Sequence, residues 1–253
     1  MIKLVISGCN GHMGRIVNDI ASGDRDIDVV AGFDVNTETR GSFPVFACPS
    51  EFTGSADVVV DFSSALALEP LLEFGVSTRT PLVLCATGYS QGQTVSIGEA
   101  AKLIPVFRSA NMSLGINLLA DLVKRACAVL GSAFDVEIVE RHHRRKVDAP
   151  SGTALMLADA AASVLPYDPE YIYQRQSVRQ PREAHEIGIS SIRGGTVVGE
   201  HEVIFAGLDE VIELKHTAAS RDIFAAGAIK AAKFIAQTVR PGLYDMNDIL
   251  SGL

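Results

Sequence analysis

Short apolar runs alternate with amphipathic segments along the first half of the chain. The runs are rich in Val, Ile and Leu, are bounded by Gly, Ser or Asp, and lie at residues 2–6, 29–33, 58–60, 82–85 and 105–107. Uninterrupted apolar runs of this length are typical of parallel strands that are covered on both faces. Helical patterns separate them, at residues 12–21, 65–74 and 91–103. The alternation predicts βαβ units and an α/β fold built on a doubly wound parallel sheet.

The pattern changes after residue 111. The elements expected beyond it are a helix at 114–130, a strand at 134–140, a helix from 150 onward, a polar stretch at 166–186, strands at 188–193, 201–205 and 210–215, and an Ala-rich helix at 221–239. Consecutive strands without intervening helices are typical of antiparallel or mixed sheets. The second half is therefore predicted to form a separate α+β domain with a mixed sheet.

Composition narrows the class of protein. The chain has 253 residues, of which 47% are hydrophobic and 21% charged, enough for a sizeable core in one or two domains. The net charge of -8 and the aromatic content of 6% argue against a nucleic-acid partner. No apolar run approaches the roughly 18 residues of a membrane-spanning helix, and the N-terminus does not read as a signal peptide. The 4 cysteines are scattered without metal-ligand spacing, which predicts a reduced, cytoplasmic protein without a metal site.

A glycine-rich turn follows the first predicted strand and opens the first helix. Gly8, Gly11 and Gly14 have the spacing G-x-x-G-x-x-G, a variant of the fingerprint of Rossmann-type dinucleotide-binding domains. Asp34 ends the second strand about 20 residues further on, where a carboxylate accepts hydrogen bonds from an adenosine ribose. Strand-to-helix turns also use glycine for steric reasons alone. The strand, the helix and the acid together nevertheless favour nucleotide binding, with the pyrophosphate at the helix N-terminus.

The residues after Asp34 bear on the choice of nicotinamide cofactor. Val35 and Asn36 follow it, and neither supplies positive charge for the 2′-phosphate of NADPH. A bare carboxylate repels a phosphate, so NADH is expected to bind at least as well as NADPH. An arginine that folds over the site, Arg15 or Arg40, is the alternative by which the phosphate would be bound.

A run of six basic or imidazole residues, 141–146, interrupts this acidic chain. One interpretation is a solvated charge run or a localisation-type patch. The other is an anion-binding catalytic loop, because the run follows a predicted core strand and leads into a helix. Ser151 is a natural N-cap there, and it leaves the N–H groups of Gly152 and Thr153 pointing outward, where they bind carboxylate or phosphate.

The second interpretation gives the run a chemistry. A small dianionic substrate fits a helix N-terminus flanked by positive charge far better than a nucleic acid does. A partly desolvated lysine among like charges, Lys146, suits a general acid. His142 and His143 are candidates for substrate binding and proton transfer.

The stretch from Glu140 to Ala154 carries a family resemblance. It reads E-x-H-H-x-x-K-x-D-x-P-S-G-T-A, and with it the chain resembles the 4-hydroxy-tetrahydrodipicolinate reductase (dihydrodipicolinate reductase) family of lysine and diaminopimelate biosynthesis. The likeness extends over nearly the whole chain, through residues 8–14, 58–63, 86–89, 110–111, 199–201, 216–221 and 242–246.

The resemblance implies an activity and a set of site residues. The activity is NAD(P)H-dependent hydride transfer to a cyclic unsaturated dicarboxylate, which gives tetrahydrodipicolinate. His142 is then the proton donor or acceptor and Lys146 the proton donor. His143 binds the substrate, and Gly152 and Thr153 hold one of its carboxylates. The cofactor-binding residues are Gly8, Cys9, Asn10, Gly11, His12, Met13, Asp34, Cys85, Ala86, Thr87, Ser109, Ala110, Asn111 and Met112.

The resemblance also implies a domain division and an assembly. Residues 1–112 and 220–253 form the dinucleotide-binding domain, and residues 113–219 form a substrate-binding and oligomerisation domain that joins four subunits into a homotetramer. The family commonly has Gly-Thr-Thr-Gly where this chain has Cys85-Ala86-Thr87-Gly88. Cys85 lacks the freedom of glycine at positive φ, so the loop near the nicotinamide is expected to sit differently. Many members carry a basic residue at Val35, which bears on cofactor choice and not on the reaction.

Two other functions are compatible with a Rossmann-type domain. One is a nucleotide-sensing regulator that uses residues 141–146 as its partner surface, and the other is an enzyme of this fold with a changed substrate. The intact His142, Lys146 and 151–153 favour the reductase over both.

Overall fold

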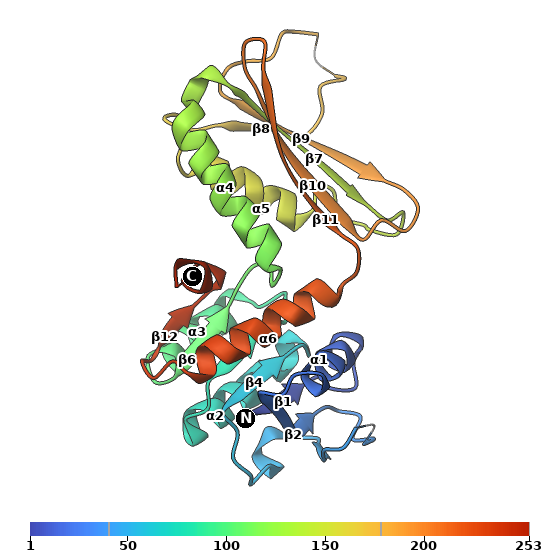
Figure 1. Ribbon diagram of the computed structural model, residues 1–253, viewed down its shortest axis with the longest axis vertical. Helices are drawn as coiled ribbons and strands as arrows, with labels where there is room; N and C mark the ends of the chain where they lie inside the picture. The colour runs from blue at the N-terminus through green and yellow to red at the C-terminus, as the bar shows by residue number, and fades with distance from the viewer. Residues whose placement is uncertain (40, 178, 253) are drawn as a thin grey trace. The chain divides into compact units, whose positions relative to one another are not determined.

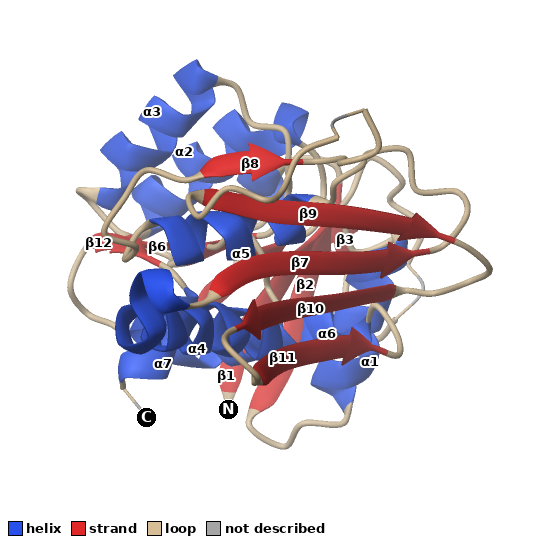
Figure 2. Cartoon of the chain, turned by 90° about the horizontal axis from the view of Figure 1, so that it is seen from above, coloured by secondary structure: helices blue, strands red, loops and turns tan. Residues whose placement is uncertain are grey.

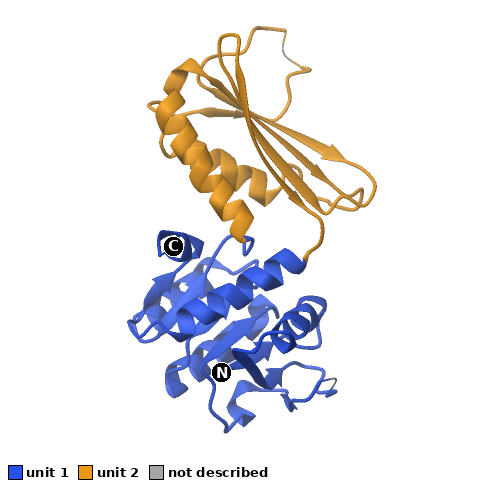
Figure 3. Ribbon diagram, viewed as in Figure 1, with its two compact units in different colours: residues 1–113, 222–253 blue, residues 114–221 orange. Residues whose placement is uncertain are grey.

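The computed structural model describes residues 1–39, 41–177 and 179–252. They fall into two compact units (Figure 3). Unit 1 comprises Met1–Ser113 and Asp222–Leu253, and unit 2 comprises Leu114–Arg221. Unit 2 is therefore inserted into the chain of unit 1, whose last helix comes after the insertion. None of the helices that the structure describes is long and apolar enough to cross a membrane.

Unit 1 is built on a seven-stranded sheet in the order β12-β6-β5-β4-β1-β2-β3, and every neighbouring pair is parallel. The strands are β1 (Ile2–Ser7), β2 (Ile27–Phe33), β3 (Val45–Phe46), β4 (Val58–Asp61), β5 (Leu82–Leu84), β6 (Pro105–Arg108) and β12 (Gly242–Tyr244). The helices are α1 (His12–Ser22), α2 (Leu68–Thr78), α3 (Gln91–Ala101), α6 (Asp222–Ala236) and α7 (Met246–Ser251), with 3-10 turns η1 (Pro49–Glu51) and η2 (Ala65–Ala67).

Helices cover both faces of this sheet (Figure 1), so its strands are mostly apolar. Val5, Val59 and Leu82 share one core with α2 and α3. On the other face α6 packs against β4, β5 and β6, with α1 beside it. The predicted doubly wound α/β fold is confirmed. The chain direction across the sheet reverses between β1 and β4, and in such folds ligands bind at this reversal, at the carboxyl ends of the strands.

Unit 2 is a five-stranded mixed sheet in the order β11-β10-β7-β9-β8. Its strands are β7 (Asp135–His142), β8 (Glu170–Ile172), β9 (Glu186–Arg193), β10 (Gly199–Ala206) and β11 (Val211–Ala218). Figure 2 shows β7 and β9 running the same way and β10 the opposite way between β7 and β11. The predicted mixed sheet is confirmed.

Two helices, α4 (Leu114–Leu130) and α5 (Gly152–Ala162), cover one face of this sheet. Alternate side chains of β7 point toward them, and Val136 and Ile138 pack into their core. The same alternation buries Glu140 and His142 at the end of the strand. The strand therefore carries two ionisable groups on its buried face.

Several short elements escape the sequence pattern. The sequence did not predict the strands β3, β8 and β12, because strands of two or three residues are too short to show a period. It also did not predict the helix α7, which has 6 residues. β8 lies inside the stretch expected to be a polar excursion. The helix predicted at 65–74 is a 3-10 turn followed by α2, which continues to Thr78, and the helix predicted at 221–239 ends at Ala236.

Candidate active site

The turn after β1 is shaped by its glycines. Gly8 adopts φ +76°, and a Cβ there would lie 2.9 Å from the carbonyl carbon of Phe62 and from Cα of Ser63. A Cβ on Gly14 would lie 2.1 Å from the Gly8 carbonyl oxygen, so only glycine lets α1 start this close to the turn. Gly11 is the N-cap of α1 and donates its N–H to the Gly8 oxygen at 3.0 Å. No side chain caps α1, and its N-terminus presents the positive end of the helix dipole at the turn.

Asp34, directly after β2, holds this turn in place by accepting hydrogen bonds. One carboxylate oxygen accepts the backbone N–H of Asn10 at 2.9 Å, and the other accepts the N–H of Asn36 at 3.0 Å. The Asn10 amide in turn donates to the Glu38 carbonyl at 2.9 Å. Burial, with the charge of Asp34 adding to it, raises the pKa of the Cys9 thiol to about 11, so this cysteine is an uncharged packing residue. Asp34 thus fixes the shape of the turn through its hydrogen bonds.

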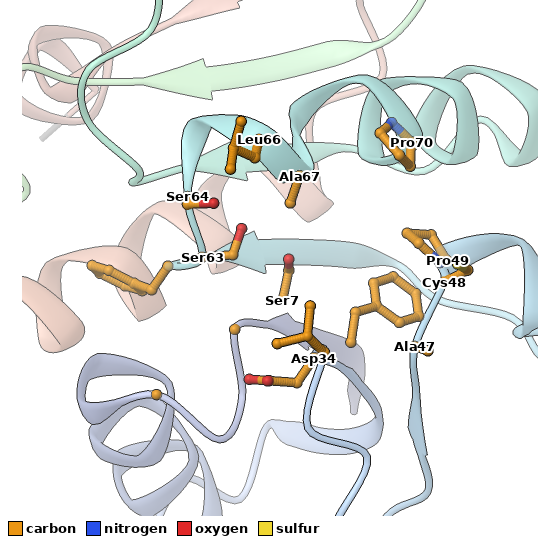
Figure 4. Close-up of a pocket in the computed structure, with 15 residues that line it drawn as sticks. Ser7, Asp34, Ala47, Cys48, Pro49, Ser63, Ser64, Leu66, Ala67 and Pro70 are labelled. Carbon is orange, nitrogen blue, oxygen red and sulfur yellow. The ribbon is translucent and has the colours of Figure 1, made fainter.

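A cavity of about 490 Å³ opens at this edge of the sheet (Figure 4). Figure 4 shows Asp34 on one wall and Leu66, Ala67 and Pro70 on the opposite one. The described lining residues are Ser7, Gly8, Gly11, Phe33, Asp34, Val35, Ala47, Cys48, Pro49, Phe62, Ser63, Ser64, Leu66, Ala67 and Pro70. None of them is a lysine or an arginine. A carboxylate, hydroxyl groups and apolar walls together suit a nucleoside.

The sequence predicted one wall of this cavity and missed the other. The segment from Phe62 to Pro70 follows β4, which lies beside β1 in the sheet. The position of this segment directly after a parallel strand is a usable signal, but the order of strands is not readable from one sequence. Val35 and Leu66 line the cavity while remaining 97% and 93% exposed, which leaves two apolar side chains at its opening.

The remaining predicted cofactor residues follow β5 and β6 on the same edge. Cys85 donates its backbone N–H to the Asp61 carbonyl at 2.9 Å, and the positive φ of this loop, +80°, belongs to Gly88. Cys85 is not among the described residues with a positive φ. The expectation that this loop sits differently from that of other family members stays a prediction. The Ser109 hydroxyl donates to the Asn111 carbonyl at 3.0 Å, which folds the turn after β6. Neither segment is among the described residues that line the cavity.

In unit 2, His142 ends β7 beside a buried carboxylate. Its Nδ1 lies 2.6 Å from Oε2 of Glu140. The two terminal guanidinium nitrogens of Arg193, Nη1 and Nη2, donate to this carboxylate at 2.7 Å, and the Ser151 N–H donates to it at 3.2 Å. Burial alone would raise the pKa of the Glu140 carboxyl, but hydrogen bonds from Arg193, His142 and Ser191 lower it to about 2. The carboxylate is therefore ionised at neutral pH.

Part of the basic run 141–146 is paired with carboxylates. Lys146 Nζ lies 2.9 Å from a carboxylate oxygen of Asp148, and this hydrogen bond lowers the pKa of the Asp148 carboxyl. Arg141 forms ion pairs with Glu200 at 3.0 Å and with Glu202 at 3.5 Å. The expectation that Lys146 lies only among like charges is thus incomplete, since a carboxylate two residues away contacts it directly.

The predicted N-cap of α5 is confirmed. Ser151 Oγ accepts the Ala154 N–H at 3.2 Å, and α5 begins at Gly152. The same hydroxyl lies 2.9 Å from Nε2 of His201, whose ring meets the ring of His142 edge to face at 5.1 Å. The fold thus brings His142, Ser151 and the start of α5 together. The sequence missed Arg193 and His201 as site residues, because they reach the site from other strands.

Acid is expected to destabilise the fold through His201. Burial, with charge on His142, lowers the pKa of its imidazole to about 4, against 6.5 for an ordinary histidine. Between these pH values the unfolded chain binds a proton that the folded chain does not, so the free energy of unfolding falls as pH falls from about 6.5 to about 4. We expect His201→Gln to reduce the slope of this dependence by up to about 1.4 kcal/mol per pH unit, measured by urea unfolding.

His216 is an internal control, because it contributes to the pH dependence of both the unchanged protein and His201→Gln. It is half-buried, and burial lowers the pKa of its imidazole as well. An unchanged slope in His201→Gln would show that His201 does not gain a proton on unfolding.

Comparison with known proteins decides the family. The profile described as "Dihydrodipicolinate reductase, N-terminus" matches residues 2–112, and the one described as "Dihydrodipicolinate reductase, C-terminus" matches residues 115–250. The chain belongs to the dihydrodipicolinate reductase family. The predicted family is confirmed, and so is the prediction of an oxidoreductase. Membership of a reductase family, with a Rossmann-type unit, supports a nicotinamide cofactor.

Curated members of the dihydrodipicolinate reductase family match nearly the whole chain. The 4-hydroxy-tetrahydrodipicolinate reductase of Caldanaerobacter subterraneus subsp. tengcongensis is 51% identical over 250 residues, covering 99% of this chain and 98% of that protein. The enzyme of the same name from Clostridium perfringens is 47% identical over 251 residues, with the same two coverages. Among solved structures, "Dipicolinate bound Dihydrodipicolinate reductase from Paenisporosarcina sp. TG-14" superposes with a TM-score of 0.82 at 22% identity, covering 98% of this chain and 99% of that one.

Proposed function

We propose that this protein is a cytoplasmic reductase of 4-hydroxy-tetrahydrodipicolinate that uses NADH or NADPH and gives tetrahydrodipicolinate. The observation that carries the proposal is the folding of the stretch from Glu140 to Ala154 into one site. This site combines an oriented imidazole, an ammonium group and a helix N-terminus. Close relatives bear the name of this activity over the full length of the chain.

The cofactor is proposed to bind unit 1, which serves as the dinucleotide-binding domain. The residues present fit it, because the missing Cβ atoms of Gly8 and Gly14 let the turn pack closely against Phe62 and the start of α1, and the uncapped N-terminus of α1 lies at this turn. Residues 8–13 would hold the pyrophosphate and Asp34 the adenosine ribose. The segments Cys85–Thr87 and Ser109–Met112, on the same edge, would contact the nicotinamide half.

The substrate is proposed to bind unit 2. Loss of its 4-hydroxyl as water leaves a C=C bond conjugated to an imine, and two hydrogens are then added across C3 and C4. When bound, a nicotinamide cofactor would supply the hydride for C4. Lys146, with His142, delivers the proton to C3. His143 binds the substrate, and the N-terminus of α5, from Ser151 to Thr153, holds one of its carboxylates.

NADH is proposed to bind at least as well as NADPH. The Asp34 carboxylate lines the cavity, and the exposed Val35 beside it has no charge. Arg15 donates to the Gly11 carbonyl of its own helix at 3.3 Å, and Arg40, the other arginine considered, lies outside the described residues.

Val35→Arg is expected to shift the preference toward NADPH, because a guanidinium at the cavity opening pairs with the 2′-phosphate. An increase in kcat/KM for NADPH relative to NADH on the order of tenfold corresponds to about 1.4 kcal/mol. Steady-state kinetics with both cofactors measure it. Unchanged selectivity would show that another residue contacts the phosphate.

A homotetramer is proposed to form through the sheet of unit 2. The helices of the unit cover one face, and on the other face Val211 and Ile192 are 59% and 47% exposed. Light scattering should give about four times the chain mass of 26.9 kDa. A monomer mass at micromolar concentration would exclude this assembly.

A coupled assay tests the proposed reaction. The condensation product of aspartate semialdehyde and pyruvate is generated in place, and consumption of NADH or NADPH is followed by absorbance. Turnover with either cofactor supports the reductase. Cofactor binding without turnover would instead support a nucleotide-sensing regulator.

A further inference from the structure

The buried carboxylate of Glu140 connects parts of the substrate site that are far apart in the sequence. Its side chain is 0% exposed. Its oxygens contact Nδ1 of His142 on the same strand, the guanidinium of Arg193 on β9, and the backbone N–H of Ser151 at the start of α5. One carboxylate therefore contacts both the imidazole of His142 and the start of α5, which is proposed to hold a carboxylate of the substrate.

The charge of Glu140 decides which nitrogen of His142 carries the proton. An ionised carboxylate only accepts hydrogen bonds, so at 2.6 Å the Nδ1 of His142 must donate. In the neutral ring the lone pair then lies on Nε2. The same carboxylate stabilises the ring when Nε2 takes up a proton, because the imidazolium and Glu140 have opposite charges.

The space beside Nε2 is kept open. A Cβ on Gly199 would lie 3.2 Å from Nε2 of His142, closer than side-chain carbons normally approach. Gly199 begins β10, next to β7, so no side chain from that position fills the space beside Nε2. Glu140 thus occupies Nδ1, and the glycine leaves room beside Nε2.

Charged and titratable groups surround His142 from each neighbouring element. Glu140 lies on its own strand, Arg193 on β9, His201 on β10, and Lys146 in the loop that follows. Arg193 also donates to the Asp148 carbonyl at 2.7 Å, so the guanidinium that neutralises Glu140 also fixes the loop that carries Lys146. His201 is largely neutral at pH 7 and adds little competing charge.

We propose that Glu140, held by Arg193, is a positioning residue that fixes His142 with Nδ1 protonated and Nε2 free to exchange a proton, and that places the N-terminus of α5 beside it. The role of Nε2 in turnover rests on the proposed function. The fixed tautomer does not, and it is measurable without substrate.

Glu140→Gln tests the kinetic consequence. A glutamine that accepts from Arg193 through its oxygen turns its NH₂ group toward Nδ1, which favours the opposite tautomer. We expect kcat to fall on the order of 10²- to 10³-fold, as when the orienting carboxylate of a catalytic histidine is neutralised. The Kd for NADH should stay within about twofold, because the glycine turn belongs to unit 1. The pH profile of kcat should also change, because the charge beside His142 is removed.

Glu200→Gln is the matched control. Glu200 is also a carboxylate paired with an arginine of β7, Arg141 at 3.0 Å, but it lies on the opposite face of the sheet from His142. We expect its kcat and pH profile to stay close to those of the unchanged protein. Equal losses in the two variants, or an unaltered kcat and pH profile in Glu140→Gln, would overturn the positioning role.

Nitrogen-15 NMR of histidine-labelled protein tests the tautomer directly, with His142→Asn used to assign the resonances. In the unchanged protein with a neutral His142 ring we expect a protonated Nδ1 and an unprotonated Nε2. A protonated Nε2 would overturn the proposal even if Glu140→Gln fails to fold. If the coupled assay shows no turnover, the proposed function fails while this measurement still decides the role of Glu140.

Discussion

Lys146→Ala is expected to lower kcat on the order of 10²-fold or more, the usual effect of removing a general acid. The Lys146 side chain is only 21% exposed and its ammonium lies 2.9 Å from the Asp148 carboxylate, so it has a defined position from which to donate a proton. NADH binding should barely change, because the glycine turn that would hold the cofactor belongs to unit 1. Steady-state kinetics with the condensation product and titration of NADH by fluorescence measure the two quantities separately.

Arg145→Ala is the matched control for this prediction. Arg145 is the adjacent residue of the same basic run, and its side chain is exposed. If the run is a solvated charge cluster, the two variants will have equally small effects. If Lys146 donates the proton, only Lys146→Ala loses turnover, and retention of full activity in Lys146→Ala would remove it from the mechanism.

Gly14→Ala is expected to weaken NADH binding by at least about tenfold, roughly 1.4 kcal/mol. The new Cβ would lie 2.1 Å from the Gly8 carbonyl oxygen and 2.7 Å from Cα of Cys9, so α1 or the turn must move. Overpacking of this kind costs about 1–3 kcal/mol of stability as well. Fluorescence titration gives the affinity, and urea unfolding gives the free energy of unfolding.

Gly98→Ala is the control for Gly14→Ala. It replaces a glycine whose Cβ has room, so it separates the effect of losing a glycine from the effect of the clash at Gly14. Gly98 lies within α3, and a Cβ there meets nothing within 4 Å. Alanine is the better helix former, so this variant should be more stable by about 0.5–1 kcal/mol with unchanged NADH affinity. Normal NADH affinity in Gly14→Ala would mean that the turn adapts and that the glycine spacing does not define the site.

The fold of this chain was largely readable from its sequence because long buried elements carry their own period. Strands such as β1 and β4 are apolar on both faces, and α4 runs over the residues predicted for it. β12 was not readable, since a three-residue strand joins the sheet only by pairing with β6, more than a hundred residues earlier in the chain. The pairing partner, not the local sequence, makes Gly242–Tyr244 a strand.

The candidate site was readable only where its residues lie in one stretch. His142, Lys146 and Ser151 follow one another along the chain, and local rules connect each to a role. Arg193 contacts the same site from β9 through a register that no local pattern specifies. Contacts that depend on register and strand order, including the wall of the cavity after β4, therefore remain outside the reach of a single sequence.

The insertion of unit 2 has a consequence for how the protein is made. The ribosome completes Leu114–Arg221 before it has produced α6 and β12, which pack against and extend the sheet of unit 1. Domains usually fold in the order of their synthesis. Here the later unit is finished first, and the sheet of unit 1, with six of its seven strands already synthesised, is completed only when β12 follows. During translation, the glycine turn therefore belongs to an incomplete sheet until the last helices emerge.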